Sequence, residues 1–159
     1  MTTTRFRSGL VQLARFRVSE STVIEPGDLL YLDGGVVRPA GDFAWQTDLA
    51  TTRAAFAAVF VGIAHTGSAA GETDLVSADI SPLAVYEAVT IPANFNVGDL
   101  LAPAETVSAL ASQTLDQVSD PSHAIARSVE STTATSPTVR SCFASSIHAG
   151  SANVNAAVG

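Results

Sequence analysis

Several residue types are scarce or missing in this chain of 159 residues. It has no lysine, one cysteine and one tryptophan, and only 14% of its residues are charged. A single cysteine excludes an internal disulfide and a zinc site built from several cysteines. The missing lysine excludes a Walker-type phosphate loop, and no apolar run approaches the ~18 residues of a membrane span. Serine, threonine and alanine replace the missing charges, which indicates a surface suited to packing against other subunits.

All eight basic residues are arginines, and they are unevenly distributed. Four of them lie in the first 17 residues, which contain no acid, whereas the remaining residues hold four arginines and all 15 acids. The chain as a whole is acidic, with a net charge of −7, which argues against nucleic acid as a partner. We therefore predict a basic N-terminal arm, residues 1–18, attached to an acidic body.

The arm holds the candidate partner-binding residues. The tripeptide Arg-Phe-Arg occurs twice in it and supplies all six: Arg5, Phe6, Arg7, Arg15, Phe16 and Arg17. The composition also fits a transit peptide, but residues 14–18 alternate between polar and apolar side chains as a strand does. Two interpretations stay open. The arm is either an edge strand with solvated arginines, or a docking strand that hydrogen-bonds to a neighbour and pairs its arginines with acidic groups. That neighbour can be another copy of the same chain.

Short apolar runs separated by turn residues predict a mainly β fold. Residues 29–38 predict a hairpin, because the Asp-Gly-Gly at 33–35 supplies the positive φ angles of a tight turn. One helix is predicted at about residues 49–59, with Thr47 or Asp48 as its N-cap. We expect a small β-barrel or sandwich with this short inserted helix and extended N- and C-terminal arms.

This barrel is expected to occupy residues 19–148. The last residues, 149–159, are small and show no periodicity, so they predict a C-terminal tail that is flexible or ordered by a partner.

The tetrapeptide Gly-Asp-Leu-Leu occurs at residues 27–30 and again at 98–101. Placing Ala64 on Ala126 aligns the residues that follow each copy and puts Val76 near Val139. The interval from Gly27 to Ala64 is nine residues longer than that from Gly98 to Ala126, and the predicted helix lies in the longer interval. The sequence therefore predicts two related strand units, with a helix inserted in the first.

No arrangement of residues predicts a catalytic, cofactor or metal site. The three histidines, His65, His123 and His148, are far apart in sequence. No GxSxG motif is present. A triad of serine with His65 and either Asp74 or Asp79 is conceivable, but polar strand ends and turns are the favoured interpretation.

The remaining candidates are a thiol and three aromatic residues. Cys142 lies beside a phenylalanine in an expected strand and is interpreted as a buried structural thiol. Phe43, Trp45 and Phe56 could line a ligand pocket near the helix. The favoured interpretation is that they hold the helix onto the barrel.

Six short motifs occur in a recognisable order within about residues 20–145. In this order they resemble the small β-barrel head decoration proteins, or capsid cement proteins, of tailed bacteriophages. The expected helix and the two terminal arms extend beyond that pattern. The motifs are Glu25-Pro26-Gly27-Asp28, Gly62-Ile63-Ala64, Ala69-Ala70-Gly71-Glu72, Val85-Tyr86-Glu87, Val97-Gly98-Asp99 and Ile125-Ala126-Arg127.

The resemblance implies a non-enzymatic virion protein without a cofactor. Such proteins bind the outside of the major capsid shell after it expands, often as trimers, and hold adjacent subunits together. It thus implies the capsid exterior as location, the major capsid protein as partner, and a homo-oligomer, with a trimer favoured. Two alternatives stay open: another virion component, such as a tail tube, head fibre or fibre base, and a small β-barrel glycan-binding module or hydrolase.

Overall fold

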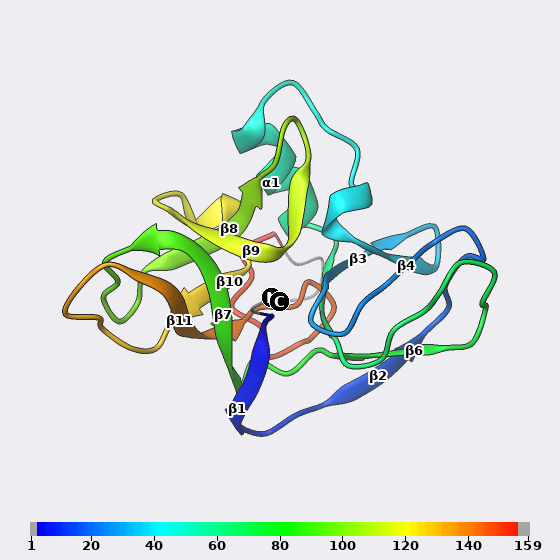
Figure 1. Cartoon of the computed structure of the whole chain (residues 1–159), viewed down its shortest axis with the longest axis horizontal. Helices are drawn as coiled ribbons and strands as arrows, with labels where there is room; N and C mark the ends of the chain where they lie inside the picture. The colour runs from blue at the N-terminus through cyan, green and yellow to red at the C-terminus, as the bar shows by residue number, and fades with distance from the viewer. Residues whose placement is uncertain (1–2, 156–159) are drawn as a thin grey trace.

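The computed structural model describes residues 3–155, which are mainly β, as predicted. Figure 1 shows two strand units side by side. The first unit is a sheet in the order β2-β6-β5-β3-β4. Its strands are β2 (Leu13–Phe16), β3 (Leu29–Asp33), β4 (Val36–Pro39), β5 (Phe60–Ala64) and β6 (Val76–Asp79).

The second unit is a closed five-stranded barrel in the order β7-β11-β10-β8-β9. A parallel pairing between β7 and β9 closes it, and β1 (Arg5–Gly9) adds a strand at the outer edge of β7. Its strands are β7 (Ala84–Ala93), β8 (Leu100–Glu105), β9 (Leu110–Val118), β10 (Ala126–Ser128) and β11 (Ser136–Phe143).

The two units share one topology, which confirms the predicted pair of related strand units. Each starts with its first strand at one edge and then follows the same spatial order. The parallel pairings that join the edge strands of the two units also correspond. The second barrel closes where Val89 pairs in parallel with Thr114, and in the first unit a single parallel bridge joins Arg17 to Val36. The strand registers make Arg17 the counterpart of Val89 and Val36 the counterpart of Thr114.

The repeated Gly-Asp turns have nearly identical geometry. Gly27 and Gly98 have φ angles of 96° and 94°, a region that glycine enters without a steric penalty. The Asp28 carboxylate accepts a hydrogen bond from the backbone N–H three residues earlier at 2.9 Å, and Asp99 does the same at 2.8 Å. Each carboxylate therefore holds its own turn closed.

The predicted register between the units was wrong by two residues in one strand. Gly27 N–H donates to the carbonyl of Ala64, and Gly98 N–H donates to that of Ser128, both at 2.8 Å. Ala64 is thus the counterpart of Ser128, not of Ala126. Shared alanines suggested the wrong alignment because identity at one small residue does not report the pairing partner.

The N-terminal arm does not stand apart from the barrel, so the predicted boundary after residue 18 is not a boundary of the fold. β1 pairs with β7 of the second unit, and β2 pairs with β6 of the first. Residues 5–16 therefore run antiparallel to residues 76–87 across both units (Figure 1). We call this pair of segments the crossover ribbon.

The inserted helix is α1 (Leu49–Ala57), which confirms the prediction and ends two residues earlier. The side chain of Asp48 caps it by accepting from the N–H of Thr51 at 2.7 Å. Phe56 is fully buried in the larger apolar core, and Phe43 packs against that core. Their rings meet edge to face at 5.4 Å, so these two residues hold the helix in place. Two short 3-10 helices complete the fold: η1 (Ala40–Asp42) and η2 (Pro121–His123).

The described part of the predicted C-terminal tail, residues 149–155, lies against the body. Asn153 is buried, and its side-chain amide donates to the carbonyls of Ala57 and Ala144, each at 2.9 Å. Asn155 donates to the carbonyl of Ser122 at 2.6 Å. The tail thus joins the end of α1 to the end of β11, while residues 156–159 lie outside the described range.

Candidate functional site

Exposed apolar side chains gather along the crossover ribbon. Leu10 is 68% exposed, and Leu83 on the facing segment is 61% exposed. The two are neighbours, because Leu10 N–H donates to the carbonyl of Leu83 at 3.2 Å. Exposed apolar residues that follow one another along a segment can form a binding surface. We call this set the ribbon strip: Phe6, Leu10, Val11, Leu13 and Leu83.

Close approach of the two ribbon segments accounts for this exposure. Gly9 has a φ angle of 93°, and a Cβ atom there would lie 2.1 Å from the carbonyl oxygen of Leu83. The two backbones therefore approach each other closely at Gly9, where no side chain lies between them. The apolar residues that follow Gly9 have no second layer over them, so they face outward.

Three arginines beside the ribbon strip have no ion-pair partner among residues 3–155. Arg7 is paired, since its guanidinium lies 2.7 Å from the carboxylate of Glu87. Arg5, Arg15 and Arg17 are exposed and form none of the ion pairs in this part of the chain. Their positive charge is thus available to a partner with acidic groups.

Five of the six predicted arm residues lie at the surface, and the sixth packs against a core. The arginines and Phe6 lie at the surface, and the Phe6 ring also packs edge-on against Tyr86 with centroids 5.8 Å apart. Phe16 packs instead against the smaller core, so it serves the fold. Sequence reasoning missed the other four residues of the ribbon strip: Leu10, Val11, Leu13 and Leu83. The signal for Leu10 was the apolar pair at 10–11, because a strand cannot bury two consecutive side chains on one face.

A buried hydrogen-bond network joins the two units beneath the ribbon. The hydroxyl of Tyr86 donates to Asp79 at 2.6 Å, and Nε2 of His65 lies 2.7 Å from the same hydroxyl. The second oxygen of Asp79 accepts from the N–H groups of Gln12 and Ser81 at 3.0 and 2.9 Å. The network therefore connects the residue after β5 with β6, β7 and the N-terminal segment.

This network does not resemble a nucleophilic site. Burial, followed by the hydrogen bond to Asp79, raises the pKa of Tyr86 far above its usual value. Its hydroxyl thus stays protonated and is a poor nucleophile. The structure joins His65 to Asp79 through Tyr86, whereas Asp74 takes no part in the hydrogen bonds described for this network.

The other titratable candidates are dispersed. His123 lies 3.8 Å from Asp120, and His148 is hydrogen-bonded to Gln12 at 2.9 Å. Burial raises the pKa of the Cys142 thiol, so the thiol stays protonated at neutral pH and is a weak nucleophile. Among residues 3–155, no three His, Cys, Asp or Glu side chains are grouped to hold a metal ion. No helix in that part of the chain is long and apolar enough to cross a membrane.

Trp45, the third predicted pocket residue, is partly exposed and follows Phe43 in the segment leading to α1. A shallow pocket does lie nearby, lined by Tyr31, Arg38 and Phe43 among others, but Trp45 is not one of its lining residues. Trp45 and Phe56 therefore do not line a common ligand pocket here.

The chain matches no family model, and no curated protein is significantly similar to it. The functional interpretation therefore depends on the surface itself. An apolar strip bordered by arginines can bury apolar area and pair with carboxylates of a partner. It offers no group that transfers a proton or attacks a substrate.

Proposed function

We propose that the protein is a non-enzymatic capsid decoration protein of a tailed bacteriophage, which binds the outer surface of the major capsid shell and stabilises it. The observation that carries this proposal is the ribbon strip with its three unpaired arginines. Such a surface fits a partner with exposed apolar side chains and carboxylates. The order of the six barrel motifs, from Glu25 to Arg127, supports the same assignment.

Stabilisation follows from binding to one state of the shell. A protein that binds the expanded shell and not its unexpanded precursor favours the expanded state by mass action. Each contact can be weak, because a homo-oligomer that touches several shell subunits at once gains avidity. The small, weakly charged surface residues of this chain suit such repeated packing, and a trimer on the capsid exterior is the arrangement we favour.

The polar clusters of the fold are more consistent with a structural role than with catalysis. The hydrogen-bonding capacity of Asp79 and Tyr86 is used within the chain. The carboxylates of Asp28 and Asp99 are likewise used to close turns. A hydrolase or glycan-binding module would instead present such groups to a cleft.

The test is binding to expanded and unexpanded shells of the virus from which the protein derives. Deleting residues 1–17 would remove β1 and β2 and disrupt both units, so substitutions are needed. We expect a triple variant, Arg5→Ser, Arg15→Ser and Arg17→Ser, to lose roughly tenfold or more in affinity for expanded shells, about 1.4 kcal/mol. A single-arginine comparison is Arg140→Ser on β11, whose guanidinium lies 3.9 Å from the carboxylate of Glu130.

Two outcomes would contradict the proposal in different ways. Undiminished decoration by the triple variant would refute the ribbon as the docking surface. Absence of the native protein from expanded shells, with density or labelling on the tail or on a head fibre, would favour another virion component instead.

A further inference from the structure

The hairpin between β8 and β9 ends in a strained turn. Its two central residues both have positive φ, 48° at Val107 and 56° at Ser108, and Thr106 N–H closes the turn by donating to the carbonyl of Ala109 at 2.8 Å. Asparagine and glycine are the residues that favour this conformation. A β-branched side chain such as valine is strongly disfavoured in it.

Nothing within the described chain compensates this strain. The Val107 side chain is 98% exposed, so it gains no burial from its position. An isolated chain would be more stable with a polar residue or glycine there. Strained backbone positions gather at functional contacts, and a partner that buries the valine would offset its strain.

An apolar groove lies at the end of the second barrel opposite the hairpin tip. It encloses about 220 Å³ between β10, β11, the start of β8 and the C-terminal segment. Its lining is mostly apolar, with one charged residue, Arg127, which is exposed and has no ion-pair partner among residues 3–155. The lining includes Leu100, Ile125, Cys142, Phe143 and Val154.

In the first unit, the face that corresponds to this groove packs against the second unit. The strand pairings make Leu29 and Ile63 of the first unit the counterparts of Leu100 and Arg127. Leu29 and Ile63 are each only 1% exposed, because they lie in the core shared with the second unit. Among residues 3–155, no third strand unit covers the equivalent face of the second unit.

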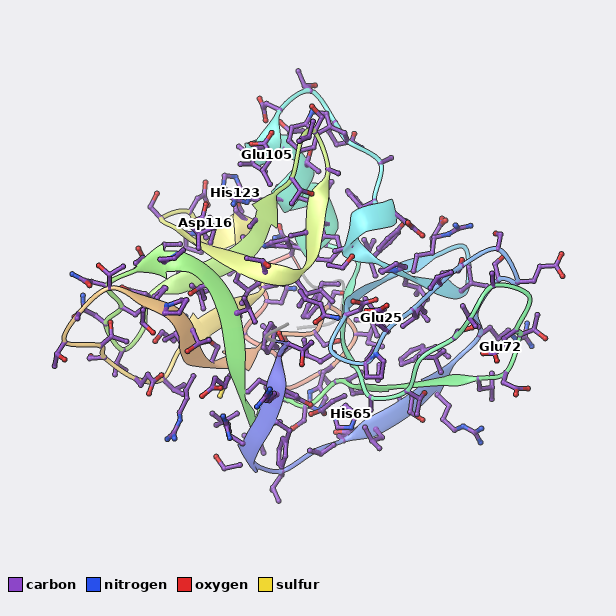
Figure 2. The ribbon with its side chains drawn as sticks, in the orientation of Figure 1. Glu25, His65, Glu72, Glu105, Asp116 and His123 are labelled. Carbon is purple, nitrogen blue, oxygen red and sulfur yellow. The ribbon has the colours of Figure 1, made fainter. Side chains whose placement is uncertain are left out.

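The hairpin tip of the same chain cannot reach this groove. Leu100 lies at the groove and begins β8, while Glu105 ends β8 beside the turn. Five residue steps along a strand span about 16 Å, and Figure 2 shows Glu105 at the hairpin beside α1. A hairpin tip that occupies this groove therefore comes from another molecule.

We infer that the Val107 tip of one copy inserts into the groove on the second barrel of another copy, with Glu105 paired to Arg127. Glu105 is exposed and, like Arg127, lacks an ion-pair partner in residues 3–155, so the opposite charges complement each other. Because the tip and the groove are different surfaces, the contact is head to tail and generates a ring where the rotation closes. The inference does not depend on capsid binding.

A disulfide trap tests the contact directly in the purified full-length protein. In the variant Val107→Cys, the new thiol would meet the native Cys142 of the next copy, and added diamide would oxidise the two thiols to a disulfide. We expect covalent dimers and higher species on a non-reducing gel. They should disappear when Cys142→Ser is added. The matched control is Gly34→Cys, at the tip of the β3–β4 hairpin, where φ is 56° and the space is open.

Charge reversal gives an independent measurement by sedimentation. Glu105→Arg or Arg127→Glu alone should weaken self-association about tenfold, and the double variant should restore most of it. Linkage that survives Cys142→Ser, equal linkage through Gly34→Cys, a monomer at every soluble concentration, or no recovery in the double variant would each overturn the inference. Shell binding by the native chain is scored separately, so either proposal can fail alone.

Discussion

Replacing Tyr86 by phenylalanine should destabilise the protein more than the same change at Tyr31. These are the two tyrosines of the chain, and both rings are buried, at 3% and 6% exposure. The substitution removes one oxygen atom in each case and leaves the ring packing in place. The difference between the variants therefore reports what each hydroxyl contributes.

The hydroxyl of Tyr86 donates to a buried carboxylate, whereas that of Tyr31 donates to a backbone carbonyl. The first hydrogen bond measures 2.6 Å to Asp79, and the second measures 3.1 Å to Asp42. A hydrogen bond to a charged group contributes about 1.5–3 kcal/mol, and one between neutral groups about 0.5–1.5 kcal/mol. Tyr86→Phe also leaves His65 without its partner. We expect losses of roughly 2–3 kcal/mol at Tyr86 and about 1 kcal/mol at Tyr31.

Urea unfolding at neutral pH measures both losses. The midpoint should fall further for Tyr86→Phe, with the m-value unchanged, since the surface exposed on unfolding is the same. Equal midpoints for the two variants would show that the Asp79 carboxylate gains nothing from Tyr86. The interpretation of the network as a connection between the two units would then be wrong.

Three further predictions concern the packing of the units. Arg53→Met should lower the free energy of unfolding by about 1–3 kcal/mol, because the buried guanidinium donates to the carbonyl of Pro103 at 2.8 Å; an unchanged urea midpoint would contradict this. The raised pKa of Tyr86 keeps its hydroxyl protonated in the folded protein, whereas in the unfolded chain the hydroxyl ionises at about pH 10. The free energy of unfolding should therefore keep its full value below that pH and fall above it. The fall should be less steep in Tyr86→Phe. Gly62→Ala should cost about 1–3 kcal/mol or more, because a Cβ there would lie 2.0 Å from the carbonyl oxygen of Asp79; a fully stable variant would refute this close approach.

Local signals in the sequence were sufficient for the elements of the fold. A helix at about 49–59 was predicted because Thr47 or Asp48 can cap it and apolar residues recur at helical spacing after them. The hairpin at 29–38 was predicted because the Asp-Gly-Gly at 33–35 accepts positive φ angles. The repeated Gly-Asp turn indicated the duplication, since a carboxylate that closes its own turn acts within four residues. All these interactions join residues that are near in sequence.

Only the tertiary structure decided how distant segments meet. The basic segment at 5–16 was expected to be an edge strand or a docking strand. It pairs with residues 76–87 of its own chain, and no local pattern identifies a partner about 70 positions away. The exposure of the ribbon strip could be seen only in the tertiary structure, where neither unit covers the crossover ribbon. The apolar groove was likewise unpredictable, because it forms where β8, β10, β11 and the C-terminal segment converge. Turn and helix preferences act over a few residues, whereas strand pairing and side-chain burial depend on the whole chain.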